Sequence, residues 1–280
     1  NVIPAETLTL GNGITTPLEV VYTIIPSAPA GENDNDCEGT PYTYSVTVLP
    51  FGQVNDFEDI IGCAGEDIGP INFSTENTGG DTTYEWTNNN TAIGLPAAGE
   101  LDYIPSFTAT AGLNSETAII SVTPTFTYNG VSCVGPIETF TITVNPVPQI
   151  DNSLDNAICH NESYTYSPVN EEDGVVPSGV TYSWGIPDTT DSTVQGTSGT
   201  NQNEFTTGII ENDDLNVAAT LTYIVTPTIL ATGCEGEDFT VTVIVNPEPQ
   251  IDDFAETICE GDTFASITPE NDTNGVVPSG

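Results

Sequence analysis

Phe239-Thr-Val-Thr-Val-Ile-Val-Asn-Pro-Glu-Pro-Gln-Ile251 sets the architecture of this chain, and Thr139-Phe-Thr-Ile-Thr-Val-Asn-Pro-Val-Pro-Gln-Ile150 is an earlier copy of it. In both copies polar and apolar residues alternate, with many β-branched side chains, which is the pattern of a half-buried strand. Each run is followed directly by the motif Asn-Pro-x-Pro. Because proline fixes φ and favours extended backbone before it, the motif predicts a strand followed by a short, semi-rigid junction.

The two copies are parts of a longer repeat. The Asn-Pro-x-Pro-Gln-Ile motif recurs after 101 residues, and so does Asp173-Gly-Val-Val-Pro-Ser-Gly179, as Asn274-Gly-Val-Val-Pro-Ser-Gly280. A degenerate earlier junction, Leu49-Pro-Phe-Gly-Gln-Val54, follows another alternating run at residues 42–48. Self-similarity at a fixed period indicates tandem copies of one folding unit.

Each repeat carries two further strand signals. An alternating run that ends in proline precedes each final strand, and a loop with one cysteine joins the two; these runs are residues 20–26, 118–124 and 221–227. Another run carries tryptophan, in Thr83-Tyr-Glu-Trp86 and Thr181-Tyr-Ser-Trp184. Short strands and hairpins between clusters of Gly, Pro, Asn and Asp predict an all-β chain of tandem immunoglobulin-like β-sandwiches.

The repeat divides the chain into four parts. We expect residues 1–50 to be the C-terminal part of one β-sandwich repeat, and residues 51–147 and 148–248 to be complete repeats. Residues 249–280 would be the N-terminal part of a further repeat. The semi-rigid junctions predict that successive domains lie end to end.

The composition excludes several classes of function. The 280 residues hold no Lys or Arg against 41 Asp and Glu, a formal net charge of −41. Such a charge repels phosphates, so nucleic acid and anionic membrane surfaces are not expected as partners, and no Lys or Arg clamp exists for a phosphorylated substrate. A disordered acidic chain is the alternative, but 37% hydrophobic residues in alternating runs favour folded strands. No signal peptide opens the chain, and no apolar run is long enough for a transmembrane helix.

The six cysteines fall in register with the repeat, which predicts disulfides in an oxidising compartment. We favour Cys63–Cys133 and Cys159–Cys234, because the first and last strands of such sandwiches often lie side by side. Bridges across the junctions are the alternative: Cys37–Cys63, Cys133–Cys159 and Cys234–Cys259. Free buried thiols are a further alternative, whereas the spacing does not suit zinc.

No catalytic residue is predicted, and the chain is not expected to be an enzyme. His160 is the only histidine, and it directly follows Cys159, whereas adjacent residues of a strand point to opposite faces. Paired carboxylates could in principle hydrolyse glycosides, but among 41 acids a close pair is uninformative.

Calcium and carbohydrate remain as candidate ligands. Asp34, Asp36 and Glu38 resemble the first half of an EF-hand loop, although the twelfth position of that loop is Ser45. Diffuse counterion screening is the alternative, and no cofactor is expected to be required. Trp86 and Trp184 occupy one repeat position, which favours a role as core aromatics of the sandwich over a carbohydrate-stacking platform.

The recurring motifs resemble a known family of repeats. They include Ile258-Cys-Glu-Gly261, Gly233-Cys-Glu-Gly236 and Asn246-Pro-Glu-Pro249, together with the tryptophan and Val-Val-Pro-Ser-Gly motifs. This set of motifs is similar to that of the PKD-like, immunoglobulin-like repeats of giant Bacteroidota surface proteins. Among these proteins are SprB-type gliding adhesins exported by the type 9 secretion system. The chain departs from the better-known PKD pattern in lacking Trp-Asp-Phe-Gly-Asp-Gly, and no functional residue of the family carries over.

The resemblance implies an extracellular, cell-surface location and a structural role. We expect a stalk or fibre segment of a long adhesin that spaces or presents an adhesive region, with gliding motility as its candidate use. Its expected partners are neighbouring repeats, surface polysaccharide and other cell-surface proteins. The alternatives are a carbohydrate-binding or calcium-dependent accessory module, and the accessory domains of an enzyme that catalyses elsewhere.

Overall fold

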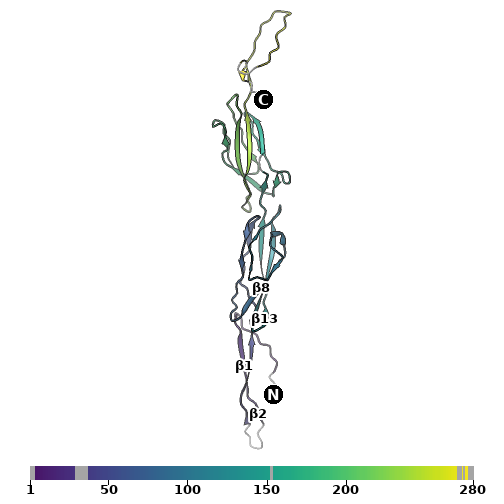
Figure 1. The fold of residues 1–280 in the computed structure, drawn as a ribbon, viewed down its shortest axis with the longest axis vertical. Coiled ribbons are helices and arrows are strands. Elements are labelled where there is room, and N and C mark those ends of the chain that lie inside the picture. The colour runs from purple at the N-terminus through teal and green to yellow at the C-terminus, as the bar shows by residue number, and fades with distance from the viewer. Residues whose placement is uncertain (1–3, 29–36, 152–153, 270–272, 274, 277–280) are drawn as a thin grey trace. The chain divides into compact units, whose positions relative to one another are not determined.

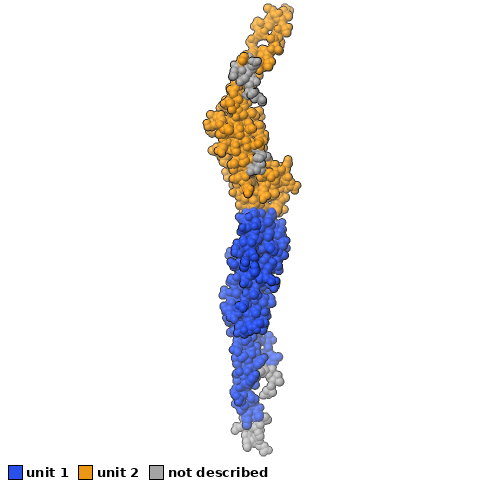
Figure 2. Space-filling model, viewed as in Figure 1, with its two compact units in different colours: residues 1–111, 116–144 blue, residues 112–115, 145–280 orange. Residues whose placement is uncertain are grey.

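The computed structural model describes residues 4–28, 37–151, 154–269, 273 and 275–276, and it is all-β. The described residues form strands and a single 3₁₀ turn, Thr91–Ile93, without an α-helix (Figure 1). Within this part of the chain no helix is long and apolar enough to cross a membrane. The chain divides into two compact units, Asn1–Ala111 with Glu116–Val144 and Gly112–Ser115 with Asn145–Gly280 (Figure 2).

The first unit begins with a lone hairpin. Strands β1 (Leu18–Ile24) and β4 (Tyr42–Val48) pair antiparallel, with Tyr22 opposite Tyr44, and form a sheet of two strands. Two short strands, β2 (Ser27–Ala28) and β3 (Cys37–Glu38), continue the hairpin toward its loop. The alternating sequence of both runs therefore forms the predicted strands.

The rest of the first unit is a complete sandwich. Its main sheet has the order β5-β14-β12-β8-β9, and β13 also pairs with β12; these strands are Ile60–Cys63, Glu138–Asn145, Glu116–Tyr128, Asp81–Asn88, Ala98–Gly99 and Val131–Val134. The second layer consists of two-residue pairs, β6 with β11 and β7 with β10; these strands are Asp67–Ile68, Phe107–Thr108, Ile71–Asn72 and Tyr103–Ile104.

The second unit repeats this arrangement. Its main sheet has the order β16-β25-β23-β19-β21, with β20 and β24 also on β23; these strands are Leu154–Cys159, Phe239–Asn246, Ala219–Ile229, Val180–Trp184, Gly199–Gln202, Asp188–Thr189 and Cys234–Glu235. The short pairs are β15 with β18 and β17 with β22, that is Gln149–Ile150, Gly174–Val175, Thr165–Tyr166 and Phe205–Thr206. Beyond the sandwich, β26 (Gln250–Ile251) pairs with β27 (Gly275–Val276).

Each sandwich has its own hydrophobic core. In both cores the inward residues of the final hairpin are fully buried, among them Ile120 and Ile142 in the first and Tyr223 and Val243 in the second. Burial raises the pKa of Tyr223 to about 12, so this phenol stays neutral at physiological pH. The period-two alternation therefore specifies which face of each strand is buried.

The cysteines differ from every pairing that the sequence suggested. Cys63 and Cys234 are each disulfide-bonded, whereas Cys37, Cys133, Cys159 and Cys259 are free. Each free cysteine belongs to a pair in the favoured scheme or in the alternative across the junctions. Neither Cys63–Cys133 nor Cys159–Cys234 is therefore formed, and the three alternative bridges are not formed either.

The direction of the first strand, β16, explains why Cys159 and Cys234 do not lie close together. The first and last strands do lie side by side, as expected, but β16 runs parallel to β25 and brings Cys159 opposite Asn246. Cys234 pairs with Ile229 at the other end of β23, whose first residue Ala219 lies opposite Val245. The two cysteines are separated by the length of β23, which has 11 residues. At about 3.3 Å per residue, this is a distance of roughly 30 Å. A disulfide requires Cα atoms within about 7 Å.

Candidate functional site: the inner face of the first hairpin

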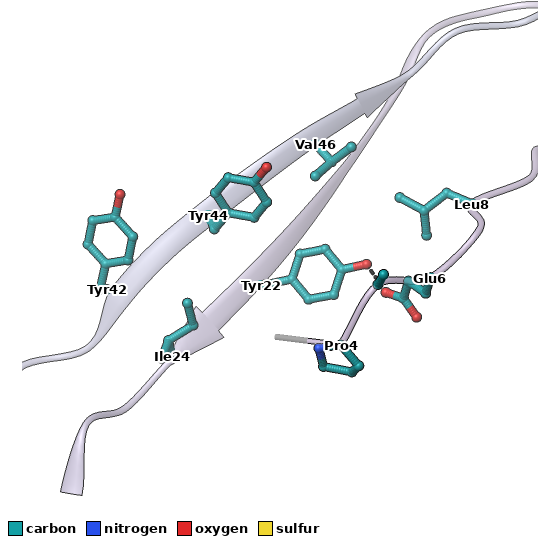
Figure 3. Close-up of a pocket in the computed structure, with 9 residues that line it drawn as sticks. Pro4, Glu6, Leu8, Tyr22, Ile24, Tyr42, Tyr44 and Val46 are labelled. Atoms are coloured by element: carbon teal, nitrogen blue, oxygen red, sulfur yellow. Dashed lines mark hydrogen bonds between the residues drawn. The ribbon is translucent and has the colours of Figure 1, made fainter. Parts of the chain in front are cut away.

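The inner face of the β1–β4 hairpin is the candidate site. Tyr22 and Ile24 of β1 and Tyr42, Tyr44 and Val46 of β4 line an open hollow of about 480 Å³, and the N-terminal segment contributes Pro4, Ala5, Glu6 and Leu8 (Figure 3). Tyr42 remains 65% exposed and Tyr44 49% exposed, which is unusual for large aromatic side chains on the inner face of a sheet. Such an apolar patch marks a surface that another chain segment can cover.

The two complete sandwiches show that this face is the core face of a repeat. Tyr22 lies opposite Tyr44 in the lone hairpin. The equivalent cross-strand pairs in the two sandwiches are Ile120 with Phe140 and Tyr223 with Val241. In the complete sandwiches the residues at these four positions are at most 3% exposed. The lone hairpin therefore has the strand register of the final hairpin of a sandwich, and its inner face corresponds to the core face.

Both edges of the lone hairpin are also unpaired within the described part of the chain. In the complete repeats β12 pairs with the tryptophan strand β8, and β14 pairs with the first strand β5, so that the hairpin is flanked on both sides. Among the described residues, β1 and β4 pair only with each other. Unpaired strand edges present free backbone N–H and C=O groups that can accept an added strand.

One polar contact lies within the hollow. The hydroxyl of Tyr22 donates a hydrogen bond to the Glu6 carboxylate from the N-terminal segment, as Figure 3 shows. This hydrogen bond, which stabilises the protonated phenol beside a carboxylate, raises the pKa of Tyr22. The segment at residues 4–8 therefore lies beside the hairpin and covers part of its face. No periodic pattern in residues 4–8 predicts this contact.

A second uncovered surface lies in the C-terminal segment. The exposed fraction of its large apolar side chains lies between 45% and 68%; these residues are Ile251, Phe254, Ile258, Phe264 and Ile267. The segment nevertheless has the local structure of the start of a repeat. The N–H of Cys259 donates to the Asp262 carboxylate at 3.1 Å, as the N–H of Cys159 donates to Glu162 at 2.9 Å. Similarly, β26 pairs with β27 in the register of β15 with β18.

A buried asparagine joins the lone hairpin segment to the first complete sandwich. The side chain of Asn77 accepts a hydrogen bond from the N–H of Gln53 at 2.7 Å and donates to the carbonyl of Phe51 at 3.1 Å. Its amide also donates to the carbonyl of Thr15 at 3.5 Å, and the N–H of Thr78 donates to the same carbonyl at 3.0 Å. Asn77 is only 8% exposed, so these bonds fix the junction. Nothing in the sequence repeat singles out this residue.

The predicted tryptophans lie in the cores. Trp86 is 3% exposed and Trp184 5% exposed, so neither offers a surface platform for a sugar ring. Each indole packs on a glycine of the neighbouring strand, Trp86 on Gly99 and Trp184 on Gly199. A Cβ on Gly199 would lie 2.4 Å from the Trp184 ring, and one on Gly99 2.6 Å from the Trp86 ring. No sequence motif marks either glycine, because the role of each depends on which strand lies opposite.

The calcium candidates are only partly described. Asp34 and Asp36 lie outside the described residues, and Glu38 is an exposed residue of β3. Within the described ranges no three His, Cys, Asp or Glu side chains lie close enough to hold a metal ion. His160 makes hydrogen bonds with the backbone of Asn212, and its Nε2 lies 4.0 Å from the Glu248 carboxylate. The calcium site stays a prediction.

Comparisons with known proteins identify the type of domain. A family model described as a PKD-like domain matches residues 5–51 and 156–249, together half of the chain. The first match is much shorter than the second and covers the lone hairpin. A comparison with curated proteins found no match.

The chain also matches solved structures at low sequence identity. The human desmocollin-1 ectodomain is 12% identical with a TM-score of 0.35; the match covers 82% of this chain and 49% of that one. Protocadherin gamma B2 domains 3–6 are 11% identical with a TM-score of 0.35, and the match covers 82% of this chain and 60% of that one. The chicken CNTN1 FN1–FN3 domains are 13% identical with a TM-score of 0.32, covering 81% and 76%. The chain thus spans about half the length of the desmocollin ectodomain.

Proposed function

The chain belongs to the PKD-like domain family, and on that premise we propose that it is a stalk segment of a long secreted cell-surface adhesin. PKD-like domains fit an extracellular adhesive or structural module and are typically not enzymes. In the proposal, tandem sandwiches lie end to end and space an adhesive region from the cell. The repeat motifs favour a Bacteroidota adhesin exported by type 9 secretion and used in gliding.

The observation that carries the proposal is the junction at Asn77. A flexible linker would leave the backbone groups at the start of a sandwich to water, whereas here one buried amide side chain binds Phe51, Gln53 and Thr15 together. Junctions with buried, satisfied polar groups resist bending more than Gly/Ser linkers do. This supports a stiff array built from the parts 1–50, 51–147, 148–248 and 249–280.

The charge distribution supports the same function. Every Asp and Glu lacks a Lys or Arg partner anywhere in the chain, so domains repel one another at long range. Repulsion between domains opposes their collapse and keeps a long array soluble. The burial of both tryptophans speaks against the carbohydrate-binding alternative. Surface polysaccharide and other cell-surface proteins remain the proposed partners of the parent adhesin.

Small-angle X-ray scattering of the monomeric chain tests the proposal. A compact protein of this length has a radius of gyration of about 19 Å. We expect a clearly larger value, with a cross-section as narrow as one sandwich. Because charge repulsion alone could extend the chain, the measurement is repeated in 0.5 M NaCl, where long-range repulsion is screened. A collapse to the compact value in salt would contradict a stiff stalk.

A further inference from the structure

We propose that the first sandwich binds an extended basic peptide of another protein along the outer edge of β8. The site consists of the uncovered part of this strand edge and of two adjoining hollows beside Trp86, next to the short strand β9. All of its residues lie within the first sandwich, between residues 81 and 107. The inference adds a binding contact that the stalk role does not require.

The chain itself covers only part of the edge of β8. Strand β9 pairs with two residues of β8, after which the chain crosses to the second layer and forms β10 with β7. The N–H of Asn88 donates to the carbonyl of Ala97 on the β9 side at 2.8 Å. Because alternate residues of a strand direct their backbone groups to the same side, Tyr84 and Thr82 also face this edge. Among the described residues no strand pairs with them there.

The second sandwich covers the same edge with its own chain. There β21 pairs with β19 as far as Tyr182, which lies opposite Gln202, and Tyr182 is the repeat equivalent of Tyr84. The open edge is therefore a property of the first sandwich and not of both. Free N–H and C=O groups in a row are the feature to which a peptide adds as a further strand.

Two hollows adjoin the open edge and offer room for side chains. The inner hollow, of about 430 Å³, is lined mainly by apolar residues, among them Trp86, Leu95, Leu101 and Phe107. The outer hollow, of about 530 Å³, shares Trp86 and Leu101 with it. Leu101 is 49% exposed although it lines both hollows. An apolar side chain of an added strand would pack against Leu101 and leave water.

Trp86 contributes a polar group that lacks a partner. Its indole N–H is buried and finds no acceptor within the described residues, whereas the indole of Trp184 donates to the carbonyl of Thr197 at 3.0 Å. A buried donor without an acceptor is unfavourable, so a peptide carbonyl would be stabilised beside it. A Cβ on Gly99 would lie 2.7 Å from the Trp86 Nε1 atom. Because β9 has only two residues, a small outward shift of β9 opens this N–H to the peptide.

The charge around the site selects a basic partner. Glu85 and Glu100 line the outer hollow, and the chain has no Lys or Arg to balance them. Basic side chains that alternate with apolar ones on the added strand would lie beside these carboxylates. Another copy of this chain offers no Lys or Arg and carries a net charge of −41, so the partner is a different protein.

Two-dimensional ¹H–¹⁵N NMR of the labelled chain in 0.15 M NaCl tests the inference. The probe is the peptide acetyl-Lys-Leu-Lys-Leu-Lys-amide, whose leucines lie on one face of a strand and whose lysines lie on the other. We expect the indole N–H signal of Trp86 and the backbone signals of Thr82 and Tyr84 to shift, while the indole signal of Trp184 stays in place. The variant Trp184→Phe assigns the two indole signals.

Two control peptides separate strand addition from simple attraction between charges. Acetyl-Lys-Ser-Lys-Ser-Lys-amide keeps the charge without the apolar side chains. The analogue with N-methylated leucines keeps both but cannot pair its backbone with the strand edge. Each should bind about tenfold more weakly or worse. Equal binding of the serine peptide would reveal diffuse attraction to an acidic chain, and equal binding of the methylated peptide would exclude strand addition. Either result overturns the inference.

A variant of the chain locates the contact. Leu101→Asn removes the apolar group that the two hollows share, and it should weaken binding of the leucine peptide about tenfold. The matched control Leu113→Asn changes a residue that is 40% exposed and lies outside the site, so it should bind like wild type. Unchanged binding by Leu101→Asn, or a peptide that shifts Trp184 and not Trp86, would also refute the proposal. The scattering experiment needs no peptide, so the stalk proposal stands or falls separately.

Discussion

Single glycines decide how each tryptophan packs. Gly199 lies opposite Trp184 across the β19–β21 pair, and the indole occupies the space that a side chain would fill. The indole N–H donates to the carbonyl of Thr197 at 3.0 Å, which fixes the ring in this position. The same glycine–tryptophan contact recurs at Gly99 and Trp86. The pair is thus a property of the repeat, although only its tryptophan has a visible sequence motif.

Gly199→Ala is expected to destabilise the second sandwich by about 1–3 kcal/mol, because the added methyl group would overlap the buried ring. Urea unfolding followed by the fluorescence of Trp184, in a Trp86→Phe background, measures the effect. Gly185→Ala is the matched control, since it adjoins Trp184 but a Cβ there meets nothing within 4 Å. Equal midpoints for the two variants would show that the ring does not depend on the glycine.

At the scale of elements, the sequence pattern identified the strands that carry the core, but it did not show whether neighbouring strands run parallel or antiparallel. The alternating runs around residues 118–124 and 239–245 became β12 and β25, with the predicted inward faces. Period-two alternation is the same in parallel and antiparallel strands, so it could not show that β16 runs parallel to β25. That one difference placed Cys159 and Cys234 at opposite ends of the sandwich.

Other elements were beyond prediction for different reasons. The second layer is built from two-residue pairs such as β6 with β11, which are too short to show any periodicity. The candidate site was predictable in part, because the repeat division predicts that residues 1–50 are the C-terminal part of a repeat, whose alternating strands carry an apolar face. Asn77 was not predictable, because its hydrogen bonds join segments that are 24 and 62 residues away.

The cysteine pattern gives a prediction for these elements. Alkylation of the denatured, unreduced chain should label Cys37, Cys133, Cys159 and Cys259, and reduction should expose Cys63 and Cys234 to a second label. Mass spectrometry of peptides from a Glu-specific or chymotryptic digest assigns each label, since trypsin has no site in the chain. If Cys133 or Cys159 takes only the second label, the arrangement of the hairpin cysteines described above is wrong.

At the scale of the whole molecule, the missing basic residues reverse the usual effect of salt. A protein with mixed charges contains ion pairs that salt weakens, whereas here the sole near pair in the described residues is His160 with Glu248, at 4.0 Å. All other long-range interactions among side chains are repulsions between carboxylates, which oppose the compact state. Screening them should therefore stabilise each sandwich and leave the apolar cores unaffected.

We expect the melting temperature to rise as NaCl increases from 10 mM to 0.5 M, because the Debye length falls from about 30 Å to well under 10 Å over this range. Calorimetry at a protein concentration at which light scattering shows a monomer keeps association out of the measurement. The same scan in millimolar calcium and in chelator, at one ionic strength, separates screening from a specific site. A calcium-dependent rise that Asp34→Asn and Asp36→Asn abolish would establish the predicted ion. Equal melting temperatures would leave diffuse screening as the whole effect, while a fall with NaCl would contradict the repulsion argument itself.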